Sequence, residues 1–67
     1  MSMKIIVNGA ELELSATTLA AALEALDYGD AVVATALNGH FVPARARATT
    51  QLAEGDRIEI VAPRQGG

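Results

Sequence analysis

The last two residues of the sequence, Gly66 and Gly67, are the first candidates for chemistry. Their reactive group is the α-carboxylate of Gly67, a nucleophile that ATP can convert to an acyl-adenylate. Residues without a Cβ pass a narrow channel and adopt any φ and ψ that it demands. Pro63 restricts the base of this tail, and the five residues after Ala62 reach at most about 17 Å when extended. The pattern predicts a tail that enters the active site of another enzyme; the alternative is a frayed end without function.

The side chains that usually carry catalysis are few and scattered. His40 is the only histidine and the sequence has no cysteine, so no metal site is expected. The carboxylate pairs Glu11/Glu13 and Glu54/Asp56 fall on a strand and in a turn, which favours solvated surface over acid–base catalysis. No glycine loop has the spacing of a phosphate-binding motif. We therefore expect a protein that is not an enzyme and that binds no cofactor and no metal itself.

Composition and charge narrow the class of protein further. The chain has 67 residues, 51% of them hydrophobic, and a net charge of −3. This apolar content favours a folded domain over disorder, and the length allows one domain. The basic residues do not form the cluster that nucleic-acid binding needs, and no apolar run approaches the ~20 residues of a membrane span. We expect a cytoplasmic protein without a signal peptide, monomeric when free, that binds neither nucleic acid nor membrane and instead meets a basic patch on a protein partner.

A β-hairpin is expected at the start of the chain. The β-branched run 3–9 ends in Asn8-Gly9, a dipeptide that favours a two-residue turn because both of its positions need positive φ. Residues 10–15 then alternate acidic and apolar side chains, as a half-buried strand does.

An amphipathic helix is expected over residues 17–28, because its apolar residues recur at helical spacing. Thr17 or Thr18 can cap its start, and Gly29 stands where a left-handed residue ends many helices. The stripe predicted to be buried consists of Leu19, Leu23 and Leu26.

The second half of the chain reads mainly as strands. Residues 31–39 are strand-like and end in a second Asn-Gly, and residues 40–43 follow as a short edge strand stopped by Pro43. The stretch after it is irregular, with a turn of helix expected around residues 50–53. Residues 57–62 alternate again and make the last strand.

Together these elements predict an α+β fold of the β-grasp, or ubiquitin-like, type. One main helix covers a mixed sheet of four to five strands, and the last strand lies in the middle beside the first. The predicted domain spans residues 1–62, and residues 63–67 form a flexible Gly-Gly tail that leaves from the centre of the sheet.

The strand alternation places apolar residues on both faces of this sheet. The side chains expected to face the helix are Ile5, Val7, Leu37, Ile58 and Ile60. The outer face then shows Ile6, Ala34, Ala36 and Val61. A contiguous apolar set indicates an interface, with Arg64 as a further contact for the partner. The alternative is that the four are merely strand formers and that Arg64 is a solubilising charge.

Four stretches of the sequence are similar to the ThiS family, the ubiquitin-like sulfur-carrier proteins of thiamine biosynthesis, and they span essentially the whole chain. The stretches are "MKIIVNG" (3–9), "TTLAAALEAL" (17–26), "VVATALNGHFVP" (32–43) and "LAEGDRIEIVAPRQGG" (52–67). The last two are the specific ones, since the first two fit many small domains.

The resemblance implies a function for the terminal glycine. In this family an adenylating, E1-like enzyme activates the residue that maps onto Gly67 with ATP, and sulfur from a donor protein then gives a thiocarboxylate. A thiazole synthase takes that sulfur into the thiazole ring. The sequence departs from the family where Val-Pro-Arg and a following aromatic residue are common, which leaves partner contacts in residues 44–52 open. Two alternatives stand beside this reading: the small subunit of molybdopterin synthase, and a non-covalent interaction module with an incidental tail.

Overall fold

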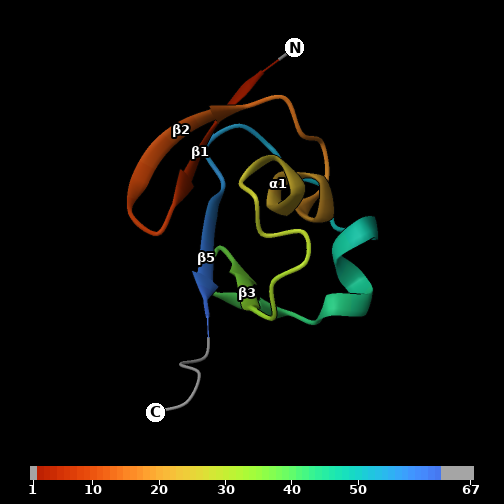
Figure 1. Ribbon diagram of the computed structural model, residues 1–67. Coiled ribbons are helices and arrows are strands. Elements are labelled where there is room, and N and C mark those ends of the chain that lie inside the picture. The colour runs from red at the N-terminus through yellow and green to blue at the C-terminus, as the bar shows by residue number, and fades with distance from the viewer. Residues whose placement is uncertain (1, 63–67) are drawn as a thin grey trace.

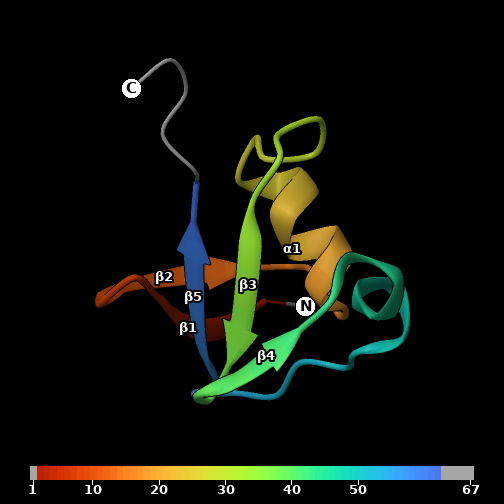
Figure 2. The ribbon, with the colours of Figure 1, turned by 90° about the horizontal axis from the view of Figure 1, so that it is seen from below.

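Five strands within residues 2–62, the part of the chain described by the computed structural model, form one mixed sheet in the order β2-β1-β5-β3-β4. The strands are β1 (Met3–Val7), β2 (Ala10–Leu14), β3 (Ala34–Leu37), β4 (His40–Val42) and β5 (Arg57–Val61). β1 and β5 run parallel, whereas the other neighbouring pairs are antiparallel. β5 therefore lies in the middle of the sheet, with β3 beside it (Figure 2), and the predicted β-grasp topology is confirmed.

Two Asn-Gly turns set the register of the hairpins. Asn8 and Gly9 have φ values of 49° and 85°, and Asn38 and Gly39 have 51° and 85°. Positive φ at both central residues is the geometry that matches the twist of a two-residue hairpin. The register that follows decides which side chains of each strand face the core, because a shift by one residue would reverse every strand face.

The helix α1 (Leu19–Ala25) is shorter than the predicted span 17–28. It begins after Thr18, whose Oγ1 accepts a hydrogen bond from the backbone N–H of Ala21 at 3.1 Å. Thr18 is thus the N-cap, one of the two candidates expected from the sequence.

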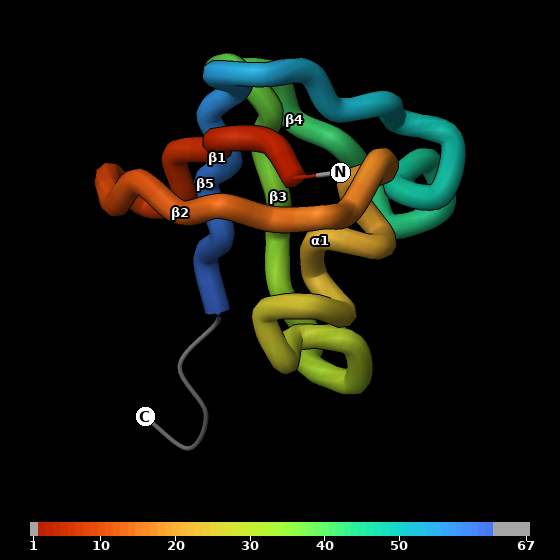
Figure 3. The backbone as a smooth tube through the Cα atoms, turned by 90° about the horizontal axis from the view of Figure 1, so that it is seen from above, coloured from red at the N-terminus to blue at the C-terminus, as the bar shows by residue number. Residues whose placement is uncertain are grey.

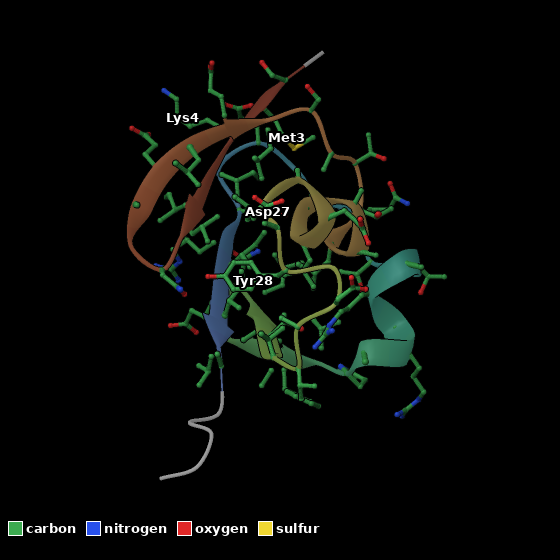
Figure 4. All side chains as sticks on the ribbon, viewed as in Figure 1. Met3, Lys4, Asp27 and Tyr28 are labelled. Atoms are coloured by element: carbon green, nitrogen blue, oxygen red, sulfur yellow. The ribbon has the colours of Figure 1, made fainter. Side chains whose placement is uncertain are left out.

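The end of α1 differs from the prediction, because the left-handed residue is Asp27 and not Gly29. Asp27 has a φ of 67°, whereas Gly29 does not have a positive φ. The N–H groups of Tyr28 and Asp27 donate to the carbonyls of Leu23 and Glu24 at 2.8 and 3.1 Å, which closes the helix in a Schellman motif. A short polar side chain tolerates the left-handed region, so the left-handed residue comes two positions earlier and α1 ends at Ala25, three residues before the predicted end. Figure 4 labels Asp27 and Tyr28 at this turn.

The segment between β4 and β5 also differs from the prediction. A 3₁₀ helix, η1 (Ala44–Thr49), follows Pro43, and the helical turn expected over residues 50–53 is absent there. Gln51 instead forms an isolated antiparallel bridge with Thr18. Thr50 is extended, with φ −90° and ψ 110°, and this conformation ends η1 before the predicted turn.

The strand predicted over 31–39 is shorter than expected and begins at Ala34. Ala34 pairs with Val61, the last residue of β5, so the residues before Ala34 have no partner strand within the described chain. Strand length here is set by the neighbour and not by the apolar run.

The core lies between α1 and one face of the sheet, and Figures 1 and 3 show the helix on that side. Its buried members are Ile5, Val7, Leu19, Ala22, Leu23, Val42, Leu52, Ile58 and Ile60. The predicted inward set is confirmed, with Leu37 only half-buried, but Leu26 is half-buried and not fully buried as predicted.

Candidate functional site

The four residues predicted to form the outer apolar set lie together on the face of the sheet opposite α1. Ile6, Ala34, Ala36 and Val61 all line one shallow hollow of about 720 Å³. Ala34 is directly opposite Val61 across the β3–β5 pair. Val61 is 64% exposed although it stands on the central strand. The sheet therefore presents an open apolar surface at the end of the strand that leads into the tail.

Phe41 belongs to the same hollow and was missed by the sequence reasoning. It lies on the edge strand β4, opposite Ala36, and is 70% exposed. Its neighbour Val42 is buried in the core, so alternation directs Phe41 outward. The signal was present in the sequence, because the Asn38-Gly39 turn places Phe41 opposite Ala36 in the hairpin.

Charges of both signs lie within the apolar surface, because Arg57 stands opposite Ile6 and Glu59 opposite Ala36. Arg57 and Glu59, on the outer face of β5, line the hollow. Further along the sheet, Lys4 Nζ lies 3.8 Å from a carboxylate oxygen of Glu11, and both side chains are largely exposed. Pairs of this kind contribute little to stability. They can instead select the orientation of a partner.

The remaining candidates for side-chain chemistry have structural roles or lie in solvent. His40 is exposed beside its turn, and residues 2–62 contain no group of three or more His, Cys, Asp or Glu side chains that could hold a metal. The Asp56 carboxylate accepts hydrogen bonds from the N–H of Ala53 at 2.8 Å and the amide of Asn38 at 3.1 Å. Glu54 accepts from the N–H of Lys4 at 3.1 Å. These carboxylates thus fasten the turn before β5.

Three of the predicted site residues, Arg64, Gly66 and Gly67, lie outside the described residues, as does the whole predicted tail 63–67. The last described residue, Ala62, follows directly after β5. No helix within residues 2–62 is long and apolar enough to cross a membrane.

Comparison with known proteins decides the family. A model of the ThiS family matches residues 5–67. The chain belongs to the ThiS family. Its structure is similar to the crystal structure of the thiamine biosynthesis protein ThiS from Geobacter metallireducens, with a TM-score of 0.81 and 28% sequence identity. The similarity covers 97% of this chain and 100% of that one. No curated protein matches the chain.

Membership of the ThiS family supports a sulfur-carrier role in thiamine biosynthesis. It also indicates a small carrier protein and not a catalytic enzyme. The matched segment begins in β1 and continues to residue 67, so it includes every residue of the outer hollow and the two terminal glycines. The outer hollow and the terminal glycines are the two features from which a carrier function can be argued. Both lie within the residues that the family model matches.

The segment 44–52 is attached to the rest of the domain through Arg47. Its guanidinium donates to the Thr35 hydroxyl at 3.0 Å and to the carbonyl of Val33 at 2.6 Å. The basic side chain is thus engaged within the domain, while Arg45 beside it is exposed.

Proposed function

We propose that this protein carries sulfur on the carboxylate of Gly67 for thiazole formation in thiamine biosynthesis. The observation that carries the proposal is the family match over residues 5–67, which reaches the terminal Gly66-Gly67. The similarity to a solved thiamine biosynthesis protein over nearly the whole chain supports the same pathway.

The chemistry proceeds in steps that each use the terminal carboxylate. A carboxylate oxygen of Gly67 attacks the α-phosphorus of ATP in the active site of an adenylating enzyme, and pyrophosphate leaves. The terminal sulfur of a persulfide on a donor protein then attacks the acyl carbon and displaces AMP. A second thiol attacks the donor's own sulfur in the resulting acyl disulfide, which forms a disulfide there and releases the thiocarboxylate. A thiazole synthase finally takes the sulfur. The absence of cysteine from the sequence agrees with this route, because the sulfur is bound to the C-terminal carbonyl and not to a thiol.

The outer hollow is the surface on which we propose that the activating enzyme docks. It combines apolar side chains with one charge of each sign, Arg57 and Glu59 on the central strand, and such a mixed composition is found in transient protein interfaces. Val61 lies in the hollow and the proposed tail 63–67 starts two residues later. An extended tail reaches about 17 Å beyond Ala62, so the domain 1–62 can dock outside while Gly67 enters a deep site. Arg64 would contact the partner along that path.

Mass spectrometry of the protein isolated from its native host tests the carrier function. A fraction of the molecules should show the mass gain of one oxygen exchanged for one sulfur, located in the C-terminal peptide. The matched control is the same protein lacking Gly67, which should show no gain. If the intact protein never shows the gain while the host is making thiamine, the interaction-module alternative is favoured.

Growth of a strain that lacks the protein separates the two pathways. We expect a requirement for thiamine that the thiazole precursor relieves. A loss of molybdenum-cofactor enzymes with normal thiamine synthesis would instead favour the molybdopterin alternative. The cytoplasmic location predicted from the sequence stays a prediction.

A further inference from the structure

The central strand β5 is held at both edges by the side chains of the two turn asparagines. On the β1 side, Asn8 donates from Nδ2 to the carbonyl of Ile60 at 3.2 Å, and its Oδ1 accepts from the N–H of Ile60 at 2.8 Å. On the β3 side, Asn38 Oδ1 accepts from the N–H of Arg57 at 2.9 Å. The two amides therefore act at opposite ends of the same strand, and Asn8 acts at the end nearer the tail.

The Asn8 amide continues a backbone ladder that would otherwise stop. β1 pairs with β5 at Ile6–Arg57 and Val7–Ile58, and the N–H of Asn8 donates to the carbonyl of Ile58 at 2.9 Å. The chain then turns away into β2 through left-handed Asn8 and Gly9. A side-chain amide offers the same donor and acceptor as a peptide group. The Asn8 side chain thus replaces the missing strand residue and extends the ladder to Ile60.

Within residues 2–62, Ile60 is the last residue of β5 that forms hydrogen bonds toward β1. On the other side of β5, the β3 ladder reaches one residue further, to Val61 opposite Ala34. Without the Asn8 amide, the end of β5 would be held by β3 alone, and it could twist about that edge. Such a twist would change the direction in which the chain leaves the sheet after Val61.

We propose that Asn8 is a positioning residue for the C-terminal glycine: its amide fixes the direction in which β5 delivers Gly67 to the activating enzyme. The inference rests on the proposed function and extends it to a residue distant in sequence from the tail. Its physical basis is that a reacting group misplaced by roughly 1 Å can lose about 100-fold in rate.

The test compares Asn8→Gly with the matched control Asn38→Gly. Both variants keep a residue that accepts positive φ in the turn, and both remove one amide from β5. ATP–pyrophosphate exchange is measured with the cognate activating enzyme over a range of carrier concentrations. We expect the maximal rate of Asn8→Gly to fall by about tenfold or more, with a smaller change in KM, because positioning acts on the reacting complex. The maximal rate of Asn38→Gly should stay within about twofold of that of the unsubstituted protein, because Asn38 holds β5 at the end far from the tail.

Hydrogen exchange of the Ile60 amide gives a readout that is independent of the enzyme. It should become faster in Asn8→Gly and remain slow in Asn38→Gly, with similar unfolding temperatures for both. Should Asn8→Gly fail to fold, Asn8→Asp takes its place in the ATP–pyrophosphate exchange assay, because it tolerates the left-handed backbone and replaces the Nδ2 donor by a charged oxygen that faces the Ile60 carbonyl.

Three results would overturn the positioning role. The first is an unchanged maximal rate, and the second is a rise in KM alone, which would make Asn8 a docking contact. The third is an equal loss of rate in both variants, which would indicate general weakening of the sheet. Absence of exchange with the unsubstituted protein would overturn the proposed function itself, and so the two failures are distinguishable.

Discussion

The guanidinium of Arg47 donates from Nε to the hydroxyl oxygen of Thr35 at 3.0 Å. Thr35 is only 2% exposed, and its hydroxyl donates in turn to the carbonyl of Val42 at 2.8 Å. Because Arg47 lies on η1 while the other two lie on β3 and β4, this polar chain ties the 3₁₀ helix to the edge of the sheet.

Replacing Thr35 by valine should destabilise the fold by about 1–3 kcal/mol. The shape of the side chain is nearly kept, but Val42 loses a donor and Arg47 loses an acceptor in a buried position. Urea unfolding measures the change. The control is Thr49→Val, whose hydroxyl bond to Ala46 is exposed and whose effect should be within about 0.5 kcal/mol. Equal midpoints for the two variants would mean that the buried hydroxyl contributes nothing.

Replacing Leu23 by alanine should cost about 2–5 kcal/mol, because its side chain is 4% exposed in the core between α1 and the sheet. A domain of this size has a small margin of stability, so a large fall in the unfolding temperature is expected. Glu24→Ala changes an exposed residue of the same helix and should leave the temperature nearly unchanged. A thermal scan in which Leu23→Ala matches Glu24→Ala would show that the stripe is not core.

The parts of the fold that local chemistry determines were predictable from the sequence. The Asn8-Gly9 and Asn38-Gly39 turns need positive φ, and the alternation between them fixes which side of each strand is buried. The end of α1 was not predictable in the same way. Asp27 and Gly29 can both adopt the left-handed region, and glycine is merely the more frequent choice.

The parts that depend on distant contacts gave no local signal. η1 is fastened by Arg47 to Thr35, 12 residues away in the sequence, and no pattern within 44–49 indicates that partner. The same holds for the candidate site. The outer apolar set followed from strand alternation, whereas the Asn8–Ile60 pairing spans 52 residues and needs the order of the strands.

Replacing Ile6 by aspartate should weaken docking without unfolding the domain. Ile6 is half-buried on the outer face and lines the hollow, so a partner that covers it would desolvate the charge further. We expect KM in ATP–pyrophosphate exchange to rise roughly tenfold or more, because an unpaired buried charge costs several kcal/mol. The control is Val32→Asp, which places the same charge on a loop residue that is 77% exposed and outside the hollow. Equal KM values for the two variants would exclude this face as the docking surface.

Removing Gly67 should abolish activation while the domain folds as before, since β5 ends at Val61. The carboxylate then stands on Gly66 and falls roughly 3.5 Å short of the position where it must attack ATP. A misplacement of about 1 Å can already cost 100-fold. The assay is ATP–pyrophosphate exchange at equal carrier concentration, with the unfolding temperature as the control for folding. Exchange at the full rate would contradict a role for the terminal residue.

Replacing Gly66 by valine should fail for a different reason, because the reach of the tail is unchanged. A β-branched side chain restricts φ and ψ and widens the tail where a narrow channel must admit it. The matched control is Gln65→Val, which adds the same branching at a position that already has a Cβ, and it should retain most of the exchange rate. If Gly66→Val exchanges as fast as Gln65→Val, the channel does not require a residue without a Cβ. If Gly66→Val and the Gly67 deletion both match the unsubstituted protein, the terminal glycines are an incidental end and the carrier function is wrong.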